Sequence, residues 1–336
     1  MTAPLIAFLV SALLAVLSTP LVRRWALRFA GERDEDIRVP AEATDTAEVR
    51  VQDVVDRGLG VPRFGGLAVA LAFYVPIAGL WLLDPQTTWA FARSPRVGLV
   101  FLLGGLGALA LGARDDARAL PVPLKLAGQL ALALGFAVVG LRVEVLSVPG
   151  LGLLTLGPWA IPATVLWLVV VMNAVNLIDG LDGLAAGLSL GIVAVLFMVS
   201  VLNAQPLGVL VGASLAGALL GFLRHNSHPA TIFLGDSGSL FLGFVLGAWS
   251  LLAWQKSATG IAVLVLVVGF AVPLVDTAFA VVRRILAGRK PWEADAGHIH
   301  HRLVGGGLSH RGAVYALYGV GVLLTAAAFV LLGVRS

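Results

Sequence analysis

Long apolar segments constrain this chain more than any other feature of its sequence. A helix needs about 20 mostly apolar residues to cross a lipid bilayer. Runs of that length recur along the whole chain, which has 59% hydrophobic and only 12% charged residues, against roughly 25% charged residues in soluble domains. We therefore predict an all-α polytopic membrane protein with about ten transmembrane helices, at 4–22, 65–84, 97–113, 123–142, 159–177, 183–202, 206–223, 238–254, 260–282 and 313–333.

The connections between these segments differ in length. Residues 203–205 and 255–259 leave room only for tight turns between antiparallel helices. The stretch 143–158 contains Pro and Gly, which predicts a loop or a small hairpin outside the hydrocarbon. Two connections are long, at 23–64 and 284–312.

The distribution of Lys and Arg predicts the orientation. The first apolar segment has no basic region ahead of it and is followed by Arg23 and Arg24, the opposite of a cleaved signal peptide. We expect a retained span with its N-terminus outside. Both long connections are then cytoplasmic, and the outside keeps only a few basic residues: Arg93, Arg96, Arg142, Lys256 and Arg335. By the positive-inside rule this predicts a multi-pass protein of the plasma (inner) membrane.

Composition also excludes some partners and chemistries. The net charge is +4, but there is no basic run, so we expect no nucleic acid partner. The chain has no cysteine, which excludes disulfides, thiolate metal sites and a cysteine nucleophile.

The titratable groups gather on one side in this topology. The cytoplasmic side holds all six histidines (His225, His228, His298, His300, His301 and His310), and the aspartates next to or between the later spans lie there too (Asp115, Asp116, Asp179, Asp182, Asp236, Asp276 and Asp295). We therefore predict an active site on the cytoplasmic face.

An acidic pair, Asp115 and Asp116, ends the third predicted span. Adjacent carboxylates repel each other, and beside a membrane they need a cation or a basic group to offset them. Such a pair can hold Mg²⁺ or take a proton from a nucleophile. The alternative is a solvated loop flanked by Arg114 and Arg118.

The stretch "NAVNLIDGLDGLAAG" places four polar residues three apart between two apolar runs: Asn173, Asn176, Asp179 and Asp182. Gly180 and Gly183 predict that the helix ends near Asp179, so the asparagines would face a cavity and the aspartates would lie in a turn. The alternative is a capping turn chosen for backbone geometry.

The stretch "HNSHPATIFLGDSGSLFLG" has a similar character. Asp236, Ser237 and Ser239 precede an apolar span, where they could cap the helix or leave its N-terminus to bind phosphate. Asp236 is a third carboxylate for a hard cation, and Phe233 could stack on a base.

The stretch "RKPWEADAGHIHHRL" holds His298, His300, His301 and Arg302. Adjacent histidines on a regular helix cannot both reach one metal ion, which argues against zinc. Histidine with arginine suits a phosphate-rich ligand better. The alternative is a surface loop with incidental histidines.

These four motifs, together with "PRFGG" at 62–66, resemble the polyprenyl-phosphate N-acetylhexosamine-1-phosphate transferases. The resemblance implies one integral membrane transferase domain over 1–336. It implies transfer of a sugar 1-phosphate, most simply GlcNAc-1-phosphate, from a UDP-N-acetylhexosamine to undecaprenyl phosphate in the membrane, with release of UMP. This would be the first membrane step of a cell-wall or surface polysaccharide. Mg²⁺ is the implied cofactor, with Mn²⁺ as a substitute.

The same resemblance assigns roles residue by residue. Catalytic roles are implied for Asp115, Asp116, His300 and His301. Metal binding is implied for Asp236 and Asp116. Substrate contacts are implied for Asn173, Asn176, Asp179, Asp182, Phe233, His298, Arg302 and Lys125. A direct attack by the lipid phosphate and a two-step route through an aspartyl phosphate on Asp115 or Asp116 both stay open, as does a homodimer.

Three other functions make different demands on the sequence. The motif "HIHHRL" after "ADAG" favours the simple N-acetylhexosamine branch over the phospho-N-acetylmuramoyl-pentapeptide transferases, which stay an alternative. Arg57 and Gly60 depart from the family's pattern ahead of "PR", which leaves the contacts of the first inner loop open. A proton-coupled secondary transporter would need polar residues deep in its spans and internal symmetry. A CDP-alcohol phosphotransferase would need an arginine and further aspartates after "DGLDGLAAG".

Overall fold

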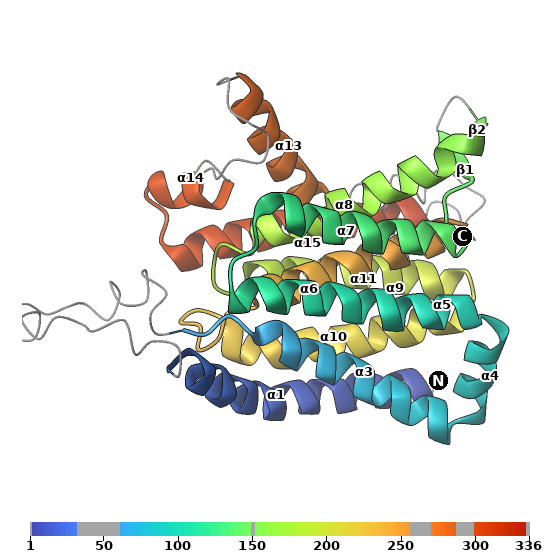
Figure 1. The fold of residues 1–336 in the computed structure, drawn as a ribbon, viewed down its shortest axis with the longest axis horizontal. Coiled ribbons are helices and arrows are strands. Elements are labelled where there is room, and N and C mark those ends of the chain that lie inside the picture. Colours follow the sequence, from blue (N-terminus) through green and yellow to red (C-terminus); the bar gives the residue numbers. More distant parts are fainter. Residues whose placement is uncertain (1, 32–60, 149–151, 256–269, 287–298, 334–336) are drawn as a thin grey trace, which may run out of the picture.

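The computed structural model describes residues 2–31, 61–148, 152–255, 270–286 and 299–333. Most helices run along one common axis (Figure 1). In chain order the helices are α1 (Thr2–Gly31), α3 (Gly65–Leu83), α4 (Pro85–Arg93), α5 (Pro95–Leu99), α6 (Gly105–Ala117), α7 (Val122–Val138), α8 (Ala160–Ile178), α9 (Leu184–Leu202), α10 (Pro206–Asn226), α11 (Gly235–Gln255), α13 (Ala271–Leu286), α14 (Ile299–Gly305) and α15 (His310–Gly333).

The prediction of an all-α polytopic membrane protein is confirmed. Within the described ranges, seven helices are long and apolar enough to cross a membrane: α1, α3, the α5–α6 segment, α8, α9, α10 and α11. Helices α7, α13 and α15 overlap the other three predicted spans. In Figure 1 α13 projects away from the bundle. The predicted turn at 255–259 and the start of the 260–282 span fall almost entirely outside the described residues.

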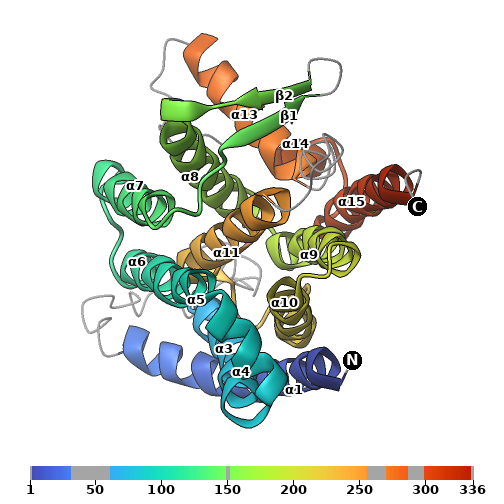
Figure 2. The same ribbon diagram turned by 90° about the vertical axis from the view of Figure 1, so that its right-hand side faces the viewer.

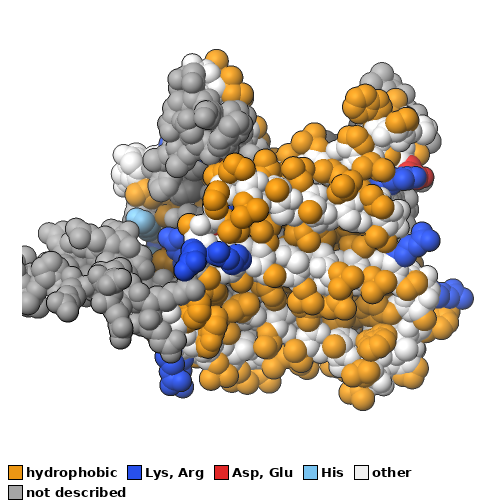
Figure 3. Space-filling model, viewed as in Figure 1, with side chains coloured by type: hydrophobic (Ala, Val, Ile, Leu, Met, Phe, Trp, Pro, Cys, Tyr) orange, Lys and Arg blue, Asp and Glu red, His pale blue; other side chains and the backbone are white. Residues whose placement is uncertain are grey.

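The surface has the pattern expected of a bundle in lipid. Figure 3 shows apolar side chains covering the flank of the bundle, while Lys and Arg side chains lie near its two ends. Large hydrophobic side chains such as Leu13, Leu21, Leu103 and Leu166 are more than half exposed, and a hydrocarbon environment accommodates them.

Helix α11 is the centre of the fold. It packs against α3, α6, α8 and α9, and Figure 2 shows it surrounded by other helices. Its side chains are buried on every face, including Phe241, Phe244 and Trp249. A helix that is apolar all round belongs in such a position, so the start of α11 has a fixed place at one end of the bundle.

The loop expectations were partly confirmed. Residues 143–158 do contain a hairpin, in which β1 (Val145–Val148) pairs antiparallel with β2 (Gly152–Thr155), followed by a 3₁₀ turn (Gly157–Trp159). The expected turn at 203–205 is closed by the N–H of Gln205, which donates to the Ser200 carbonyl at 2.8 Å.

Three helical stretches were not expected. Helix α1 continues to Gly31, so residues 23–31 are helical rather than loop, because apolar residues between its arginines allow the helix to run on. Helix α14 occupies part of the expected loop 284–312. Helix α4 begins after Asp84, whose carboxylate accepts from the N–H and the hydroxyl of Thr87, and these bonds lower the pKa of Asp84.

The segment from α5 to α6 is interrupted by one π-helical turn, Val100–Gly104. The Tyr74 hydroxyl donates to the Phe101 carbonyl in this turn at 2.6 Å. A side chain on the neighbouring helix α3 therefore satisfies a backbone group that the wide turn presents.

Candidate active site

The site is built on a backbone frame at the end of the bundle where α11 begins. The N–H groups of Gly65 and Gly66 donate to the carbonyls of Phe233 and Leu234, each at 2.9 Å, and the Phe233 N–H donates to Pro62 at 2.9 Å. Two motifs that are far apart in the sequence, "PRFGG" and "IFLG", thus pair directly and fix the entry of the chain into α11.

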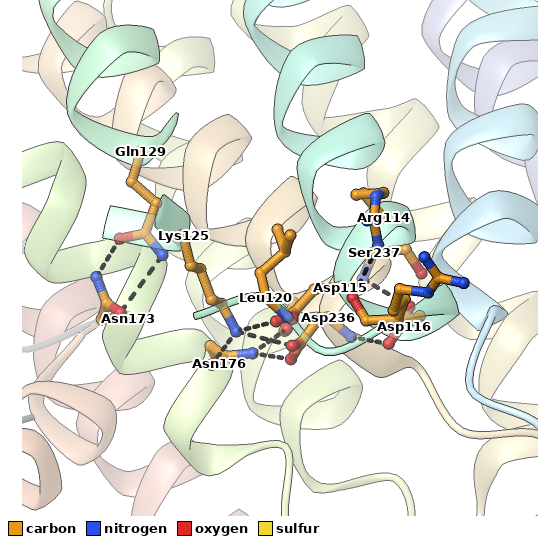
Figure 4. Close-up of polar contacts among 12 residues, drawn as sticks. Arg114, Asp115, Asp116, Leu120, Lys125, Gln129, Asn173, Asn176, Asp236 and Ser237 are labelled. Atoms are coloured by element: carbon orange, nitrogen blue, oxygen red, sulfur yellow. Dashed lines mark hydrogen bonds and ion pairs between the residues drawn. The ribbon is translucent and has the colours of Figure 1, made fainter. Parts of the chain in front are cut away.

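A cluster of two carboxylates and a lysine lies beside this frame (Figure 4). The Lys125 ammonium, on α7, is 2.8 Å from Asp115 Oδ2 and 2.7 Å from Asp236 Oδ2. The other Asp115 oxygen accepts from the Leu120 N–H at 2.6 Å. The Asp115 side chain is only 8% exposed, so its charge depends on these partners. Below, "the lysine cluster" means Asp115, Lys125 and Asp236.

Amide side chains extend the lysine cluster between α7 and α8. The Asn176 amide donates to Asp236 Oδ1 and, at 2.8 Å, to the Ser239 hydroxyl, while its oxygen lies 3.4 Å from the Lys125 ammonium. One turn after Lys125 on α7 and one turn before Asn176 on α8, Gln129 and Asn173 exchange amide hydrogen bonds. The asparagines were predicted to face a cavity. In the structure Asn176 contacts the lysine cluster, and the amide group of Asn173 is hydrogen-bonded to Gln129.

Two further carboxylates accept hydrogen bonds from backbone N–H groups at the start of α11. Asp116 Oδ1 accepts from the Asp236 N–H at 2.8 Å, and Asp116 Oδ2 accepts from the Ser237 N–H at 2.9 Å. Asp179 Oδ2 accepts from the Gly235 N–H at 3.1 Å. Helix α8 ends at Ile178, as its sequence predicts, and Asp179 follows as its C-cap residue.

Asp179 lies in an acidic environment. Burial raises the pKa of Asp179 to about 8, and the nearby carboxylates of Asp236 and Asp116 contribute to the increase. Both causes disfavour the charged form of a carboxyl group. Asp179 therefore adds no full negative charge to the site near neutral pH.

Asp182 is held elsewhere. Its Oδ2 is 2.8 Å from His228 Nδ1 and accepts from the Ala230 N–H at 3.0 Å. The His228 ring stacks on His310, with ring centroids 6.2 Å apart. These contacts tie the turn between α8 and α9 to the connection between α10 and α11, and they leave Asp182 outside the lysine cluster.

The histidine motif lies partly outside the described residues. His298 is not among them, and His300, His301 and Arg302 belong to the short helix α14, whose Arg302 is exposed. The Ile299 N–H donates to Asp276 Oδ1 on α13 at 2.8 Å, which anchors the start of α14. Helix α14 lies at the same end of the bundle as the C-terminus of α6 (Figure 1). Phe233 is half-buried beside the frame.

Two polar contributors were not among the predicted site residues. Gln129 is 1% exposed and Ser239 is fully buried. The signal for Gln129 is its spacing, because it follows Lys125 by four residues on an apolar helix and so shares its face. No comparable signal marks Ser239 as a partner of Asn176.

The donor set suits a hard cation together with phosphate. Asp115 and Asp236 already share one positive charge, that of Lys125. Mg²⁺ is commonly held by one or two carboxylates plus substrate phosphates and water. Within the described residues no group of three or more His, Asp or Glu side chains gathers in metal-binding geometry.

Known proteins resemble this chain over nearly its whole length. Residues 98–254 match the family described as glycosyl transferase family 4. The chain is 36% identical to the probable undecaprenyl-phosphate N-acetylglucosaminyl 1-phosphate transferase of Bacillus subtilis, over 97% of this chain and 84% of that protein. It is 37% identical to the decaprenyl-phosphate N-acetylglucosaminephosphotransferase of Mycolicibacterium smegmatis, over 95% and 80%. It is 34% identical to a phospho-N-acetylmuramoyl-pentapeptide-transferase of a Synechococcus species, over 79% and 77%. The family predicted from the motifs is thereby confirmed, and the chain belongs to glycosyl transferase family 4.

Proposed function

We propose that this protein transfers N-acetylglucosamine 1-phosphate from UDP-N-acetylglucosamine to a polyprenyl phosphate, most simply undecaprenyl phosphate. The product would be a lipid diphosphate sugar for cell-wall or surface polysaccharide synthesis. The observation that carries the proposal is the lysine cluster at one end of a bundle that aligns over 97% of its length with a relative of that named activity.

The reaction exchanges one phosphorus–oxygen bond for another. An oxygen of the lipid phosphate attacks the sugar-bearing phosphorus of the UDP-sugar. The bond from that phosphorus to the bridging oxygen breaks, and UMP leaves with the electron pair. Asp115, a member of the lysine cluster, would take the proton of the lipid phosphate, and Lys125 would stabilise charge on the diphosphate. In a two-step route, a carboxylate oxygen of Asp115 would instead attack that phosphorus and release UMP, and the lipid phosphate would then attack the same phosphorus and release the carboxylate.

Asp115 and Asp236 would hold Mg²⁺ through their carboxylate oxygens, and Mn²⁺ would substitute for it. Such an ion would neutralise the diphosphate and the charge that develops on the leaving group. The chain's own contribution is positional: Lys125 and Asn176 orient the Asp236 carboxylate. Asp116 was predicted as a second metal ligand, but its two oxygens already accept backbone N–H groups, which favours a different role.

Other parts of the chain would hold the substrates. Asn176, Asp179, Asp182 and Phe233 are proposed to border the nucleotide. His298, His300, His301 and Arg302 are proposed to meet the diphosphate or the sugar. The position of α14 at the same end of the bundle as α6 supports this assignment.

The orientation is proposed from charge alone. We place ten spans in the plasma (inner) membrane with the N-terminus outside and the active site cytoplasmic. Because the chain has no cysteine, single cysteines report the topology cleanly. Gln86→Cys in α4 should react with an impermeant maleimide in intact cells, and Ala119→Cys after α6 should react only in inverted vesicles. The reverse result would overturn the orientation.

A donor assay tests the function. Purified protein with Mg²⁺ and undecaprenyl phosphate is offered UDP-GlcNAc, UDP-GalNAc or UDP-MurNAc-pentapeptide, and UMP release is measured. We expect release with UDP-GlcNAc. Release only with UDP-MurNAc-pentapeptide would favour the alternative supported by the Synechococcus relative. Uptake of substrate by proteoliposomes without UMP release would favour a transporter.

The homodimer is also kept as a proposal. Its support is the large apolar flank of the bundle, which a second copy could cover in part. The mass of the detergent-solubilised protein, measured by light scattering with the detergent contribution subtracted, distinguishes one chain from two.

A further inference from the structure

Asp116 binds the backbone of α11 with both of its oxygens. The N–H groups that it accepts belong to consecutive residues, Asp236 and Ser237, at 2.8 and 2.9 Å (Figure 4). Asp115, the neighbouring residue, contacts the Lys125 side chain instead. Successive residues on a helix point about 100° apart, so the two adjacent carboxylates serve different partners.

These N–H groups need partners from outside the helix. The first four N–H groups of an α-helix have no intrahelical acceptor. Ser237 and Ser239 are fully buried, so water does not solvate this turn freely. Carboxylates also interact favourably with the positive end of a helix. Asp116, together with Asp179 on the Gly235 N–H, supplies acceptors for three consecutive donors.

The backbones of α6 and α11 are in direct contact just before Asp116. A Cβ atom on Gly112 would lie 2.1 Å from the Asp236 carbonyl oxygen. Gly112 precedes Asp116 by one helical turn. The start of α11 is therefore fixed against α6 at two successive points: the close backbone contact at Gly112 and the two hydrogen bonds that the Asp116 carboxylate accepts.

The fixed segment carries Asp236, whose side chain belongs to the lysine cluster. We propose that Asp116 is a positioning residue: it holds the first turn of α11 so that the Asp236 carboxylate faces Asp115 and Lys125. The effect of this role on catalysis rests on the proposed function. It replaces the predicted roles of Asp116 as metal ligand and as catalytic group.

Hydrogen–deuterium exchange of the full chain in detergent, without substrate, tests the contact. Asp116→Ala and Asp116→Asn should speed exchange of the Asp236 and Ser237 amides at least tenfold, because a charge-assisted hydrogen bond is lost. The matched control is Asp115→Asn, which removes the adjacent charge and should leave these amides within about twofold of the wild type. Wild-type exchange in Asp116→Ala would overturn the proposal.

The pH profile of UMP release separates positioning from chemistry. Asp116→Asn should lower kcat, change KM for the UDP-sugar little, and keep the wild-type pH profile. Loss of the acidic limb in this variant would show that Asp116 itself exchanges a proton, and would overturn the proposal.

A second variant covers the case in which Asp116→Asn has no measurable turnover. Gly112→Ala keeps every carboxylate but displaces the backbone of Asp236, so it should reproduce both the faster exchange and the lower kcat. Its control is Gly107→Ala, where the added Cβ meets only the flexible end of Leu132. Native exchange and native kcat in Gly112→Ala would overturn the proposal. Exchange needs no turnover, so a wild-type protein that releases no UMP would defeat the proposed function and leave the exchange result standing.

Discussion

Four carboxylates meet at the start of α11, and they form two groups with different partners. Asp115 and Asp236 contact the Lys125 ammonium, whereas Asp116 and Asp179 accept backbone N–H groups. The carboxylates of the first group contact a side chain, so they can bind a metal ion or face a phosphate in place of Lys125 without any change in the backbone. The second group cannot leave without exposing buried N–H donors. The comparison shows that neighbouring acids of one motif can divide into a chemical and a structural pair.

The largest effect should come from the chemical pair. Asp236→Asn keeps the size of the side chain but removes the charge that faces Lys125 and the diphosphate, so kcat should fall about 10³-fold or more. The rate of UMP release from UDP-GlcNAc measures this change in kcat. Glu144→Gln is the control, because Glu144 pairs with Arg142 beside the hairpin and should keep its activity. Near-normal activity of Asp236→Asn would remove Asp236 from the metal site.

Lys125→Met tests whether the lysine holds the chemical pair together. It leaves two partly buried carboxylates facing each other, and it should lower the free energy of unfolding by about 3 kcal/mol, measured by thermal unfolding in detergent. Combining it with Asp236→Asn should cost less than the sum of the two single changes, because the repulsion is then relieved. Additive costs would mean that the two residues act independently.

Gly66→Ala perturbs the frame that supports the structural pair. Its Cβ would lie 2.1 Å from the Gly238 nitrogen, so we expect a loss of about 1–3 kcal/mol in the free energy of unfolding together with lower activity. Gly79→Ala, on the same helix, has nothing within 4 Å of the added atom and should be neutral or slightly stabilising. Equal free energies of unfolding and equal activities in the two variants would show that the backbone frame can shift to accommodate the added methyl group.

The smallest effect is expected at Asp182, which contacts both a side chain and a backbone N–H group. His228→Ala removes its side-chain partner but keeps the Ala230 N–H. Because the pair is partly exposed, the free energy of unfolding should fall by no more than about 1 kcal/mol, as thermal unfolding would show. A much larger loss would place Asp182 with the structural pair.

Most of the fold could be predicted because membrane spans are written as uninterrupted apolar runs. Seven of the ten predicted segments coincide with helices that meet the length and hydropathy needed to span a bilayer. Helix α4 was missed because its nine residues include Gln86, Thr87 and Thr88, and its cap depends on the local geometry of Asp84. The extension of α1 past Arg24 was missed because helices do not end where the hydrocarbon ends.

The candidate site was predictable in composition but not in pairing. The motifs named Asp115, Asp116, Asn176 and Asp236, and the structure brings these residues together. The separate partners of Asp115 and Asp116 could not be inferred, because they depend on the rotation of α6 against α11. The burial of Gln129 beside Asn173 likewise follows from the register of α7 on α8.

The rotation of α6 depends on the π-helical turn at Val100–Gly104. Such a turn accommodates one residue more than an α turn, so it resets the direction of every later side chain on that helix. If the same residues formed a regular α-helix, the Asp116 side chain would point about 100° away from its present direction and would no longer face α11. The π-helical turn, about 20 Å away along the helix, thus determines the direction in which the Asp116 carboxylate points.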